Sequence, residues 1–139
     1  SHNIMTLQCD VLIEECSFAG GDALILPGGN PGYINLRNSE LVLRVVRDYY
    51  ADGRLVAAIC GAPTVLATAD VAKGCRVTCH ASVVAEMTGY NVVGGRVVEN
   101  GNLITAAGAG VSIDFALAIA SQLVDSETML RVQQGMMVI

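Results

Sequence analysis

Short apolar runs recur along the chain and alternate with segments of helical periodicity. The runs at 22–26 and 55–59 are almost entirely apolar, and a turn rich in glycine and proline follows each of them. Runs of this length without polar alternation are typical of parallel strands that are buried on both faces of a sheet. We therefore expect buried parallel strands at 22–26 and 55–59, and a further strand at 76–80.

The segments between these runs show the spacing of helices. Residues 39–51, which Asn38 or Ser39 can cap and Gly53 ends, place charged residues on one face and apolar residues on the other. Shorter helices are expected at 64–72, 82–88 and 126–134. The apolar face of the first helix consists of Leu41, Val42, Val45, Val46 and Tyr49.

Three further segments complete the pattern. Asn100-Gly101 is a strong two-residue turn signal and predicts a β-hairpin over 96–106. Residues 113–124, preceded by Ser112 as a candidate N-cap, are apolar nearly all round and predict a buried helix. Residues 4–13 have a pattern consistent with an extended segment.

The alternation of apolar strands and helices predicts a single α/β domain over residues 1–139. A parallel sheet must be covered on both faces, which gives a three-layer α/β/α sandwich with a mostly parallel sheet. Ligands of such sheets bind beyond the carboxyl ends of the strands. We therefore expect the loop 27–32, the turn 60–63 and His80 to lie along one edge of the sheet.

Composition and charge exclude several classes of function. Thirteen acidic against eight basic residues give a net charge of −5 without a basic cluster, so no nucleic-acid partner is expected. The apolar runs are shorter than the roughly 20 residues that cross a bilayer, so no membrane partner is expected. Five cysteines without disulfide-scaffold spacing suit the cytoplasm. The sequence contains neither a P-loop nor a dinucleotide fingerprint, and we expect no cofactor.

Cys60 is the leading candidate for chemistry. It ends an apolar strand, precedes two small residues and Pro63, and stands before a predicted helix. This strand-to-helix elbow exposes a nucleophile on a sharp turn, and the helix N-terminus favours the thiolate of a cysteine. The alternative is that Cys60 is one more buried small hydrophobe, the commonest fate of a free cysteine.

Two other segments could contribute groups to a site at Cys60. Gly28 and Gly29 follow the preceding strand and could present backbone N–H groups to an oxyanion, although such a cluster is often only a turn. His80 closes the strand after the elbow helix, which suits a neighbour of Cys60. A hydrogen-bonded histidine without chemistry is the alternative.

A metal site built from Cys75, Cys79 and His80 is not expected. Cys79 and His80 are adjacent on a predicted strand and should point to opposite faces. Cys75 and Cys79 should lie about 13 Å apart at roughly 3.3 Å per residue. That separation also excludes a disulfide, because bridged Cα atoms lie within about 7 Å of each other.

Taken in order, these segments resemble the ThiJ/PfpI superfamily, most closely its branch that contains the parkinsonism-associated protein deglycase. The resemblance covers essentially the whole chain. Residues 26–32 resemble the family's glycine-rich loop, and 57–63 resemble its nucleophile elbow. The strand that carries the family's active-site histidine, its hairpin and its final long helix correspond to residues 77–80, 100–105 and 115–119.

The resemblance implies a flavodoxin-like sandwich of the class I glutamine amidotransferase type, usually a homodimer. Cys60 would be the nucleophile and oxidation-sensitive thiol, with His80 nearby and the amides around Gly28, Gly29 and Gly61 forming the oxyanion pocket. The implied activities are glutathione-independent conversion of methylglyoxal to lactate and removal of early glycation adducts. A redox-sensing or chaperone role under oxidative stress is the implied alternative.

Several positions depart from the family pattern. Gly61 stands where the protease-like branch carries histidine, so a protease or amidase dyad of adjacent residues is not expected. The chain lacks the His-x-Glu pair that glutamine amidotransferases need near the chain end. Residues 106–110 read Ala-Ala-Gly-Ala-Gly where the deglycase branch commonly has Ser-Arg-Gly-Pro-Gly, so Ala107 replaces an arginine.

The family pattern also begins with a strand, a helix and a strand, and the chain enters only at the tail of that unit. A βαβ unit takes about 30 or more residues. We therefore expect an N-terminally incomplete domain, with the glutamate that hydrogen-bonds the family's cysteine on a separate N-terminal fragment of the same protein. Glu14 and Glu15 follow the wrong strand for that role and are expected to be solvated.

Three functional hypotheses follow from these residues. The first is an enzyme in which Cys60 attacks a small aldehyde or a glycated substrate. The second is a sensor or chaperone that uses oxidation of Cys60 and turns over no substrate. The third is a degenerate relative of the hydrolases that only binds a small ligand.

Overall fold

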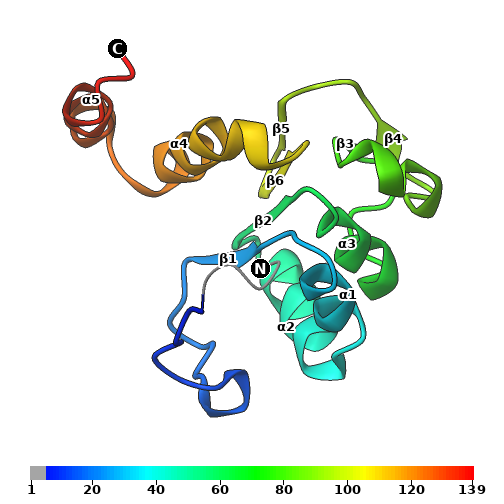
Figure 1. Cartoon of the computed structure of the whole chain (residues 1–139). Helices are drawn as coiled ribbons and strands as arrows, with labels where there is room; N and C mark the ends of the chain where they lie inside the picture. Colours follow the sequence, from blue (N-terminus) through cyan, green and yellow to red (C-terminus); the bar gives the residue numbers. More distant parts are fainter. Residues whose placement is uncertain (1–5) are drawn as a thin grey trace.

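Three parallel strands and one antiparallel strand form the central sheet of the computed structural model, which describes residues 6–139 (Figure 1). The strand order is β1-β2-β6-β5. Strands β1 (Ala23–Leu26), β2 (Leu55–Ile59) and β6 (Leu103–Ala106) are parallel, and β5 (Val97–Asn100) pairs antiparallel with β6. The predicted hairpin is thus confirmed.

Helices cover both faces of this sheet, which confirms the three-layer α/β/α prediction. Helices α1 (Gly32–Arg37), α2 (Glu40–Ala51) and α3 (Pro63–Ala69) pack on one face, and α4 (Ser112–Leu123) packs on the other. Helix α5 (Ser126–Gly135) follows α4 and contacts it at the end of an arm that projects from the sheet (Figure 1).

Helix α2 begins as its sequence predicts. The Ser39 side chain accepts a hydrogen bond from the Val42 amide at 3.4 Å and so caps the helix. The buried face differs at one position, because Leu43 is buried and Leu41 only partly. The buried residues of α2 are Val42, Leu43, Val45, Val46 and Tyr49.

The prediction that 76–80 forms one strand of the main sheet is wrong. Only Arg76–Val77 (β3) is a strand, and it pairs in parallel with Asn91–Val92 (β4) in a separate two-stranded sheet. Beyond β3, the Thr78 amide donates to the Thr105 hydroxyl at 2.9 Å, and the His80 amide donates to the Cys60 carbonyl at 2.8 Å. Isolated bonds to a side chain and to a turn therefore replace a regular ladder.

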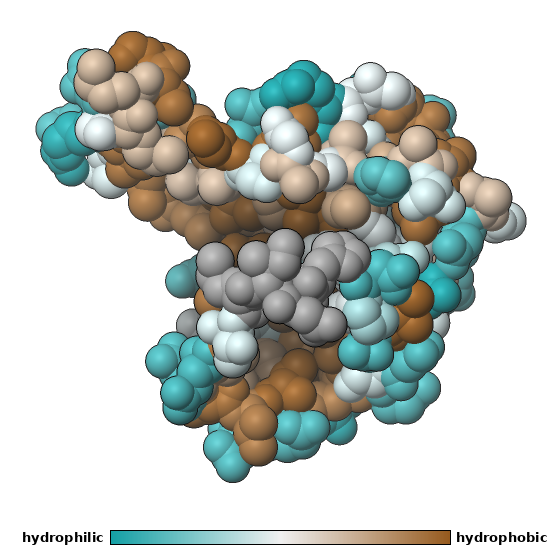
Figure 2. Space-filling model, viewed as in Figure 1, coloured by the Kyte–Doolittle hydropathy of each residue, from teal (hydrophilic) through white to brown (hydrophobic). Residues whose placement is uncertain are grey.

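The burial predicted for 113–124 is also wrong for this chain. Only Phe115 and Ile119 of α4 are buried, whereas Ile113 and Leu123 are 55% and 45% exposed. Figure 2 shows hydrophobic residues gathered along the arm that α4 forms. An apolar helix is buried all round only where neighbours surround it, and the described sheet meets one side of α4. Ser112 does not cap the helix, because its hydroxyl donates to the Ala109 carbonyl instead.

Strand β1 is parallel, as predicted, but it is not buried on both faces. It lies at the edge of the sheet, and Ile25 is 51% exposed while Leu26 is buried. Of the predicted extended segment 4–13, residues 4 and 5 lie outside the described residues. The rest has no regular structure up to a 3-10 turn at Ile13–Glu15 (η1), whose two glutamates are exposed as expected.

Three helix and turn boundaries shift for local reasons. Helix α3 ends at Ala69 rather than residue 72, because Asp70 adopts a left-handed conformation with φ 59°. The predicted helix at 82–88 is a 3-10 helix at Ala81–Glu86 (η2). The hairpin turn is Gly101–Asn102 rather than Asn100-Gly101, since Asn100 pairs with Leu103 and Gly101 takes the positive φ of 62°. A third 3-10 segment, Ala109–Val111 (η3), leads into α4.

The bond between Thr78 and Thr105 predicts a measurable stability effect. Both residues are buried, so Thr105→Val would leave the Thr78 amide without its acceptor. We expect the free energy of unfolding to fall by about 1–3 kcal/mol, measured by urea denaturation. Thr88→Val on the exposed surface is the matched control and should change it by less than about 0.5 kcal/mol. An unchanged midpoint for Thr105→Val would contradict this assignment.

Among residues 6–139, every helix is too short or too polar to cross a membrane.

Candidate active site

Cys60 lies on the sharp turn between β2 and α3. Its φ is +66°, a left-handed conformation that non-glycine residues rarely adopt and that costs about 1–3 kcal/mol. Two backbone bonds hold it there, because the Cys60 amide donates to the Ala106 carbonyl at 2.9 Å and its carbonyl accepts from the His80 amide at 2.8 Å. The thiol is free and half-buried. The elbow geometry predicted from sequence is therefore present.

Gly28 lies directly against Cys60. A Cβ atom at position 28 would come within 2.6 Å of the Cys60 Cβ, 2.8 Å of the Ile59 carbonyl oxygen and 3.4 Å of the Cys60 Sγ. Contacts this short with backbone cannot be relieved without moving the loop, so only glycine fits. The glycine loop and the elbow thus lie side by side, as the parallel order of β1 and β2 predicts.

Three backbone amides of the glycine loop and the elbow have no acceptor among the described residues. In the described part of the chain, the N–H groups of Gly28, Gly29 and Gly61 bond to no protein oxygen. The next amide, that of Ala62, is engaged with the Ile59 carbonyl at 3.1 Å. Unbonded amides of this kind can donate hydrogen bonds to oxygen atoms of a ligand.

Tyr33 is a neighbour of the site that sequence reasoning missed. A Cβ atom at Gly61 would come within 2.6–2.8 Å of the Tyr33 ring, so the ring packs flush on the elbow backbone. The Tyr33 amide donates to the Gly29 carbonyl at 2.9 Å, which ties α1 to the glycine loop. The only sequence feature that could have indicated this contact is the position of Tyr33 directly after the glycine loop 26–32.

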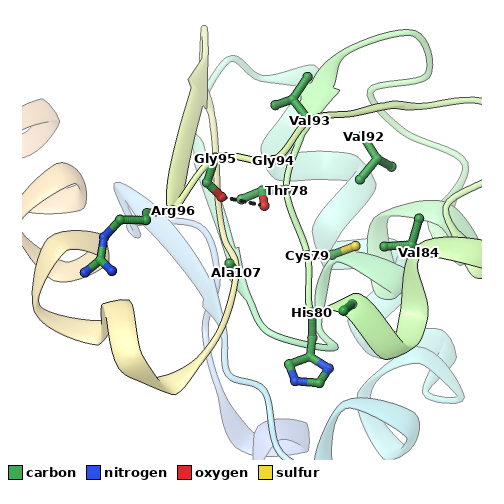
Figure 3. A pocket seen from close by; sticks show the side chains of 11 residues that line it. Thr78, Cys79, His80, Val84, Val92, Val93, Gly94, Gly95, Arg96 and Ala107 are labelled. Atoms are coloured by element: carbon green, nitrogen blue, oxygen red, sulfur yellow. Dashed lines mark hydrogen bonds between the residues drawn. The ribbon is translucent and has the colours of Figure 1, made fainter.

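His80 adjoins Cys60 through the backbone, and its ring is exposed. The ring caps η2: its Nδ1 accepts from the Ser82 amide at 3.2 Å and lies 2.8 Å from the Ser82 hydroxyl. A Cβ atom at Gly108 would come within 3.6 Å of the ring's Cδ2, so the ring also lies beside that loop. Figure 3 shows the His80 ring and the Cys79 sulfur pointing in different directions, as predicted for adjacent extended residues.

A cavity of about 520 Å³ lies beside this histidine (Figure 3). Its lining is largely apolar and includes Ala107 and Cys79. Burial raises the pKa of the Cys79 thiol, and the nearby Cys60 adds to the rise. Arg96, which also lines the cavity, forms an ion pair with Asp114 at 2.8 Å.

Across residues 6–139, no cluster of three or more His, Cys, Asp or Glu side chains could hold a metal ion.

Comparisons with known proteins cover most of the chain. A model of the DJ-1/PfpI family matches residues 1–122. The chain is 39% identical over 131 residues to "Protein DJ-1alpha" of Drosophila melanogaster, covering 92% of this chain and 60% of the relative. It is 34% identical over 116 residues to "Glutathione-independent glyoxalase DJR-1.2" of Caenorhabditis elegans, covering 82% of this chain and 61% of the relative.

The fold is likewise similar to solved structures. The crystal structure of Drosophila melanogaster DJ-1beta superimposes with a TM-score of 0.80 at 40% identity, covering 84% of this chain and 63% of that one. The chain therefore spans about three fifths of the length of these relatives.

Proposed function

Because the chain belongs to the DJ-1/PfpI family, we propose that it is a cysteine-dependent enzyme that acts on reactive aldehydes, with Cys60 as nucleophile. One observation carries the proposal: a thiol on a strained elbow lies against the glycine loop, and the amides of Gly28, Gly29 and Gly61 have no acceptor among the described residues. The name of the nematode glyoxalase supports an aldehyde as substrate. The simplest substrate to test is methylglyoxal, a 2-oxoaldehyde.

The first step is addition. The Cys60 thiolate forms a carbon–sulfur bond with the aldehyde carbon, and the electron pair of the C=O double bond moves to the oxygen. The three amides would stabilise the alkoxide that results, because they have no acceptor among the described residues. Protonation of the alkoxide gives a hemithioacetal.

The second step moves a proton and regenerates the thiol. A base takes the proton from C1 to give an enediol, a proton is returned at C2, and the hydroxyl proton on the C1 oxygen moves to the C2 oxygen. The hemithioacetal thereby becomes the thioester of a 2-hydroxy acid. Water then cleaves the thioester and releases the acid and the Cys60 thiol. The overall reaction adds one water to one 2-oxoaldehyde, so it consumes no oxidant, reductant or cofactor.

The base for the proton transfer is proposed to come from outside this chain. No carboxylate in the described residues hydrogen-bonds to Cys60. The relatives are longer, and the chain spans 60% and 61% of two of them. A glutamate on the part of the domain that this chain does not span would supply the base. Intact mass of the purified protein under denaturing conditions tests for a second peptide that carries it.

An oxidation sensor is the second candidate, favoured by the same unbonded amides. Peroxide converts a thiolate to sulfenic and then sulfinic acid, and the amides that would hold an alkoxide would also hold sulfinate oxygens. This role predicts no aldehyde turnover. Oxidation spread evenly over all five cysteines would reject it.

Cys79 provides an internal control for either role. Its raised pKa lowers the fraction of thiolate at any pH below that pKa, and the side chain is buried. We expect iodoacetamide at pH 8 to modify Cys60 much faster than Cys79, measured by peptide mass spectrometry after brief labelling. Labelling of Cys79 before Cys60 would contradict the assignment of the reactive thiol.

The assembly and location of the protein are also proposals. We propose a homodimer, because apolar side chains such as Ile113 and Leu123 are exposed on the single chain. We propose a cytoplasmic location, because the five cysteines lack the spacing of a disulfide scaffold. The separate N-terminal fragment is the other proposed partner, and glycated proteins are the other proposed substrates. Light scattering on the purified protein distinguishes one copy from two.

A further inference from the structure

The tip of the β5–β6 hairpin carries the single Asn-Gly pair of the sequence, Asn100-Gly101. Gly101 is exposed and Asn100 is half-buried. In the described part of the chain, the Gly101 amide donates to no acceptor and the Asn100 side chain makes no hydrogen bond. Apart from the backbone pairing of Asn100 with Leu103, the fold therefore leaves both reacting groups of this pair free.

An asparagine that precedes glycine can react with its own backbone. The Gly101 nitrogen forms a bond to the side-chain carbonyl carbon of Asn100, which closes a cyclic succinimide. The bond from that carbon to the side-chain NH2 breaks, and the group leaves as ammonia with the proton of the Gly101 amide. Water then opens the ring on either side and gives aspartate or isoaspartate. The reaction consumes water, releases ammonia and needs no oxidant or cofactor.

The other asparagines of the described chain lack this combination. The Ser39 amide, which follows Asn38, already donates to a helix carbonyl at 3.2 Å. Asn30 precedes Pro31, which has no N–H. Branched side chains, which crowd the attacking nitrogen, follow Asn35, Asn91 and Asn102. Within residues 6–139, only Asn100 therefore precedes a nitrogen that is both unhindered and unbonded.

Asn102, the next residue of the turn, fastens the hairpin to the rest of the domain. Its side chain donates to the Tyr50 and Arg54 carbonyls at 3.2 and 3.0 Å, and its carbonyl accepts from the Val56 amide at 2.8 Å. We call these bonds the Asn102 clamp. Isoaspartate at position 100 routes the backbone through the side-chain methylene and so lengthens the path to Asn102. A tight hairpin turn fits its two strands only at a fixed length, so the longer path displaces the clamp.

We propose that Asn100-Gly101 is a site of spontaneous deamidation, and that its isoaspartate form releases the Asn102 clamp. The ammonia is lost, so the modification accumulates with the age of each molecule. An enzyme that methylates isoaspartyl carboxylates can reach the product, because the tip of the hairpin is exposed at Gly101. The inference is independent of the chemistry proposed for Cys60.

Ageing of the purified protein at pH 8 and 37 °C tests the site. We expect the peptide that contains Asn100 to exchange NH2 for OH at least about tenfold faster than the peptide that contains Asn38, where the following amide must first give up a hydrogen bond. Peptide mass spectrometry measures both rates in one sample. A methyltransferase specific for isoaspartate, supplied with S-adenosylmethionine, reports the isoaspartate fraction. Equal rates at the two asparagines, or aspartate without isoaspartate, would overturn the proposal.

Two variants separate the site from its consequence. Asn100→Gln keeps an amide whose longer side chain closes a ring far more slowly, so ageing should not increase its methylation. Freshly purified Asn100→Asp carries the charge of the product on a backbone of normal length, so its thermal midpoint should stay near that of the parent protein. The aged parent protein should melt about 3–8 °C below the fresh protein, whereas aged Asn100→Gln should not. An unchanged midpoint in a sample that is mostly isoaspartate contradicts release of the clamp.

Asn102→Ala tests the clamp itself. The substitution removes the two side-chain bonds to Tyr50 and Arg54, so the fresh variant should already melt below the parent protein. Ageing should then lower its midpoint by less than it lowers that of the parent protein, because the two changes act on the same bonds. A further loss as large as that of the parent protein would show that isoaspartate acts elsewhere, and the clamp would be rejected as its target.

Discussion

Cys60→Ser is expected to lower kcat/KM for methylglyoxal by about a thousandfold or more. A serine hydroxyl is far less acidic than a thiol, and the described residues offer no base in contact with this position to ionise it. The loss should appear mainly in kcat, because the amides of Gly28, Gly29 and Gly61 remain in place. Steady-state rates of lactate formation without added thiol measure it.

The matched control is Cys9→Ser, which makes the same substitution at an exposed cysteine. It should leave kcat/KM within about twofold of the parent protein. Circular dichroism of both variants should show the same secondary structure, since Cys60→Ser replaces a single side-chain atom and leaves the backbone bonds of the elbow in place. More than about a tenth of the parent activity in Cys60→Ser would exclude this thiol as the nucleophile.

Gly28→Ala is expected to cause the second largest loss, about a hundredfold in kcat/KM. The added Cβ would come within 2.6 Å of the Cys60 Cβ and 2.8 Å of the Ile59 carbonyl oxygen, so either the loop or the elbow must move. A displacement of about 1 Å at a reacting group costs about a hundredfold. Overpacking of this kind also destabilises a fold by about 1–3 kcal/mol, which urea denaturation measures.

Gly32→Ala is the control within the same loop. A Cβ atom at Gly32 would meet nothing within 4 Å, and its φ is not in the left-handed region. The residue begins α1, where alanine is favourable, so we expect activity and stability close to those of the parent protein. Equal effects at positions 28 and 32 would show that the loop tolerates no change anywhere and would contradict the steric account.

The elbow could be predicted because its signals are local. A buried apolar strand ends at Cys60, two small residues follow, and Pro63 starts a helix, so neighbouring residues already define the turn. The approach of Gly28 to Cys60 also follows from sequence, since parallel strands bring their carboxyl ends to one edge. At the elbow, the local sequence preferences and the packing of the two parallel strands therefore favour the same structure.

Other contacts of the site join segments that are not neighbours in the sequence. No local sequence pattern predicts these contacts. Tyr33 packs on Gly61 because α1 lies over the elbow, and a lone tyrosine after a glycine loop does not indicate that contact. Ser82 orients His80 because the chain turns sharply into η2 rather than continuing a strand. Periodicity alone predicted an extended segment through His80, since it cannot distinguish a ladder from isolated bonds to Thr105 and Cys60.

The burial of α4 was overestimated for a related reason. Its sequence is apolar nearly all round, which predicts neighbours on all sides. The sheet buries only Phe115 and Ile119 of this helix, and Ala118 packs partly buried beside them. An apolar composition therefore predicts that a helix can be buried on all sides. The described residues of one chain cover only one side of α4.

The most direct test of the account compares the methylglyoxal consumed with the lactate formed, by NMR, in the absence of any added thiol. Catalysis through Cys60 predicts one lactate for each methylglyoxal over many turnovers, and no lactate from Cys60→Ser. Loss of methylglyoxal without lactate, ending after a few equivalents per chain, would mean that side chains only trap the aldehyde. That result would contradict the proposed enzyme.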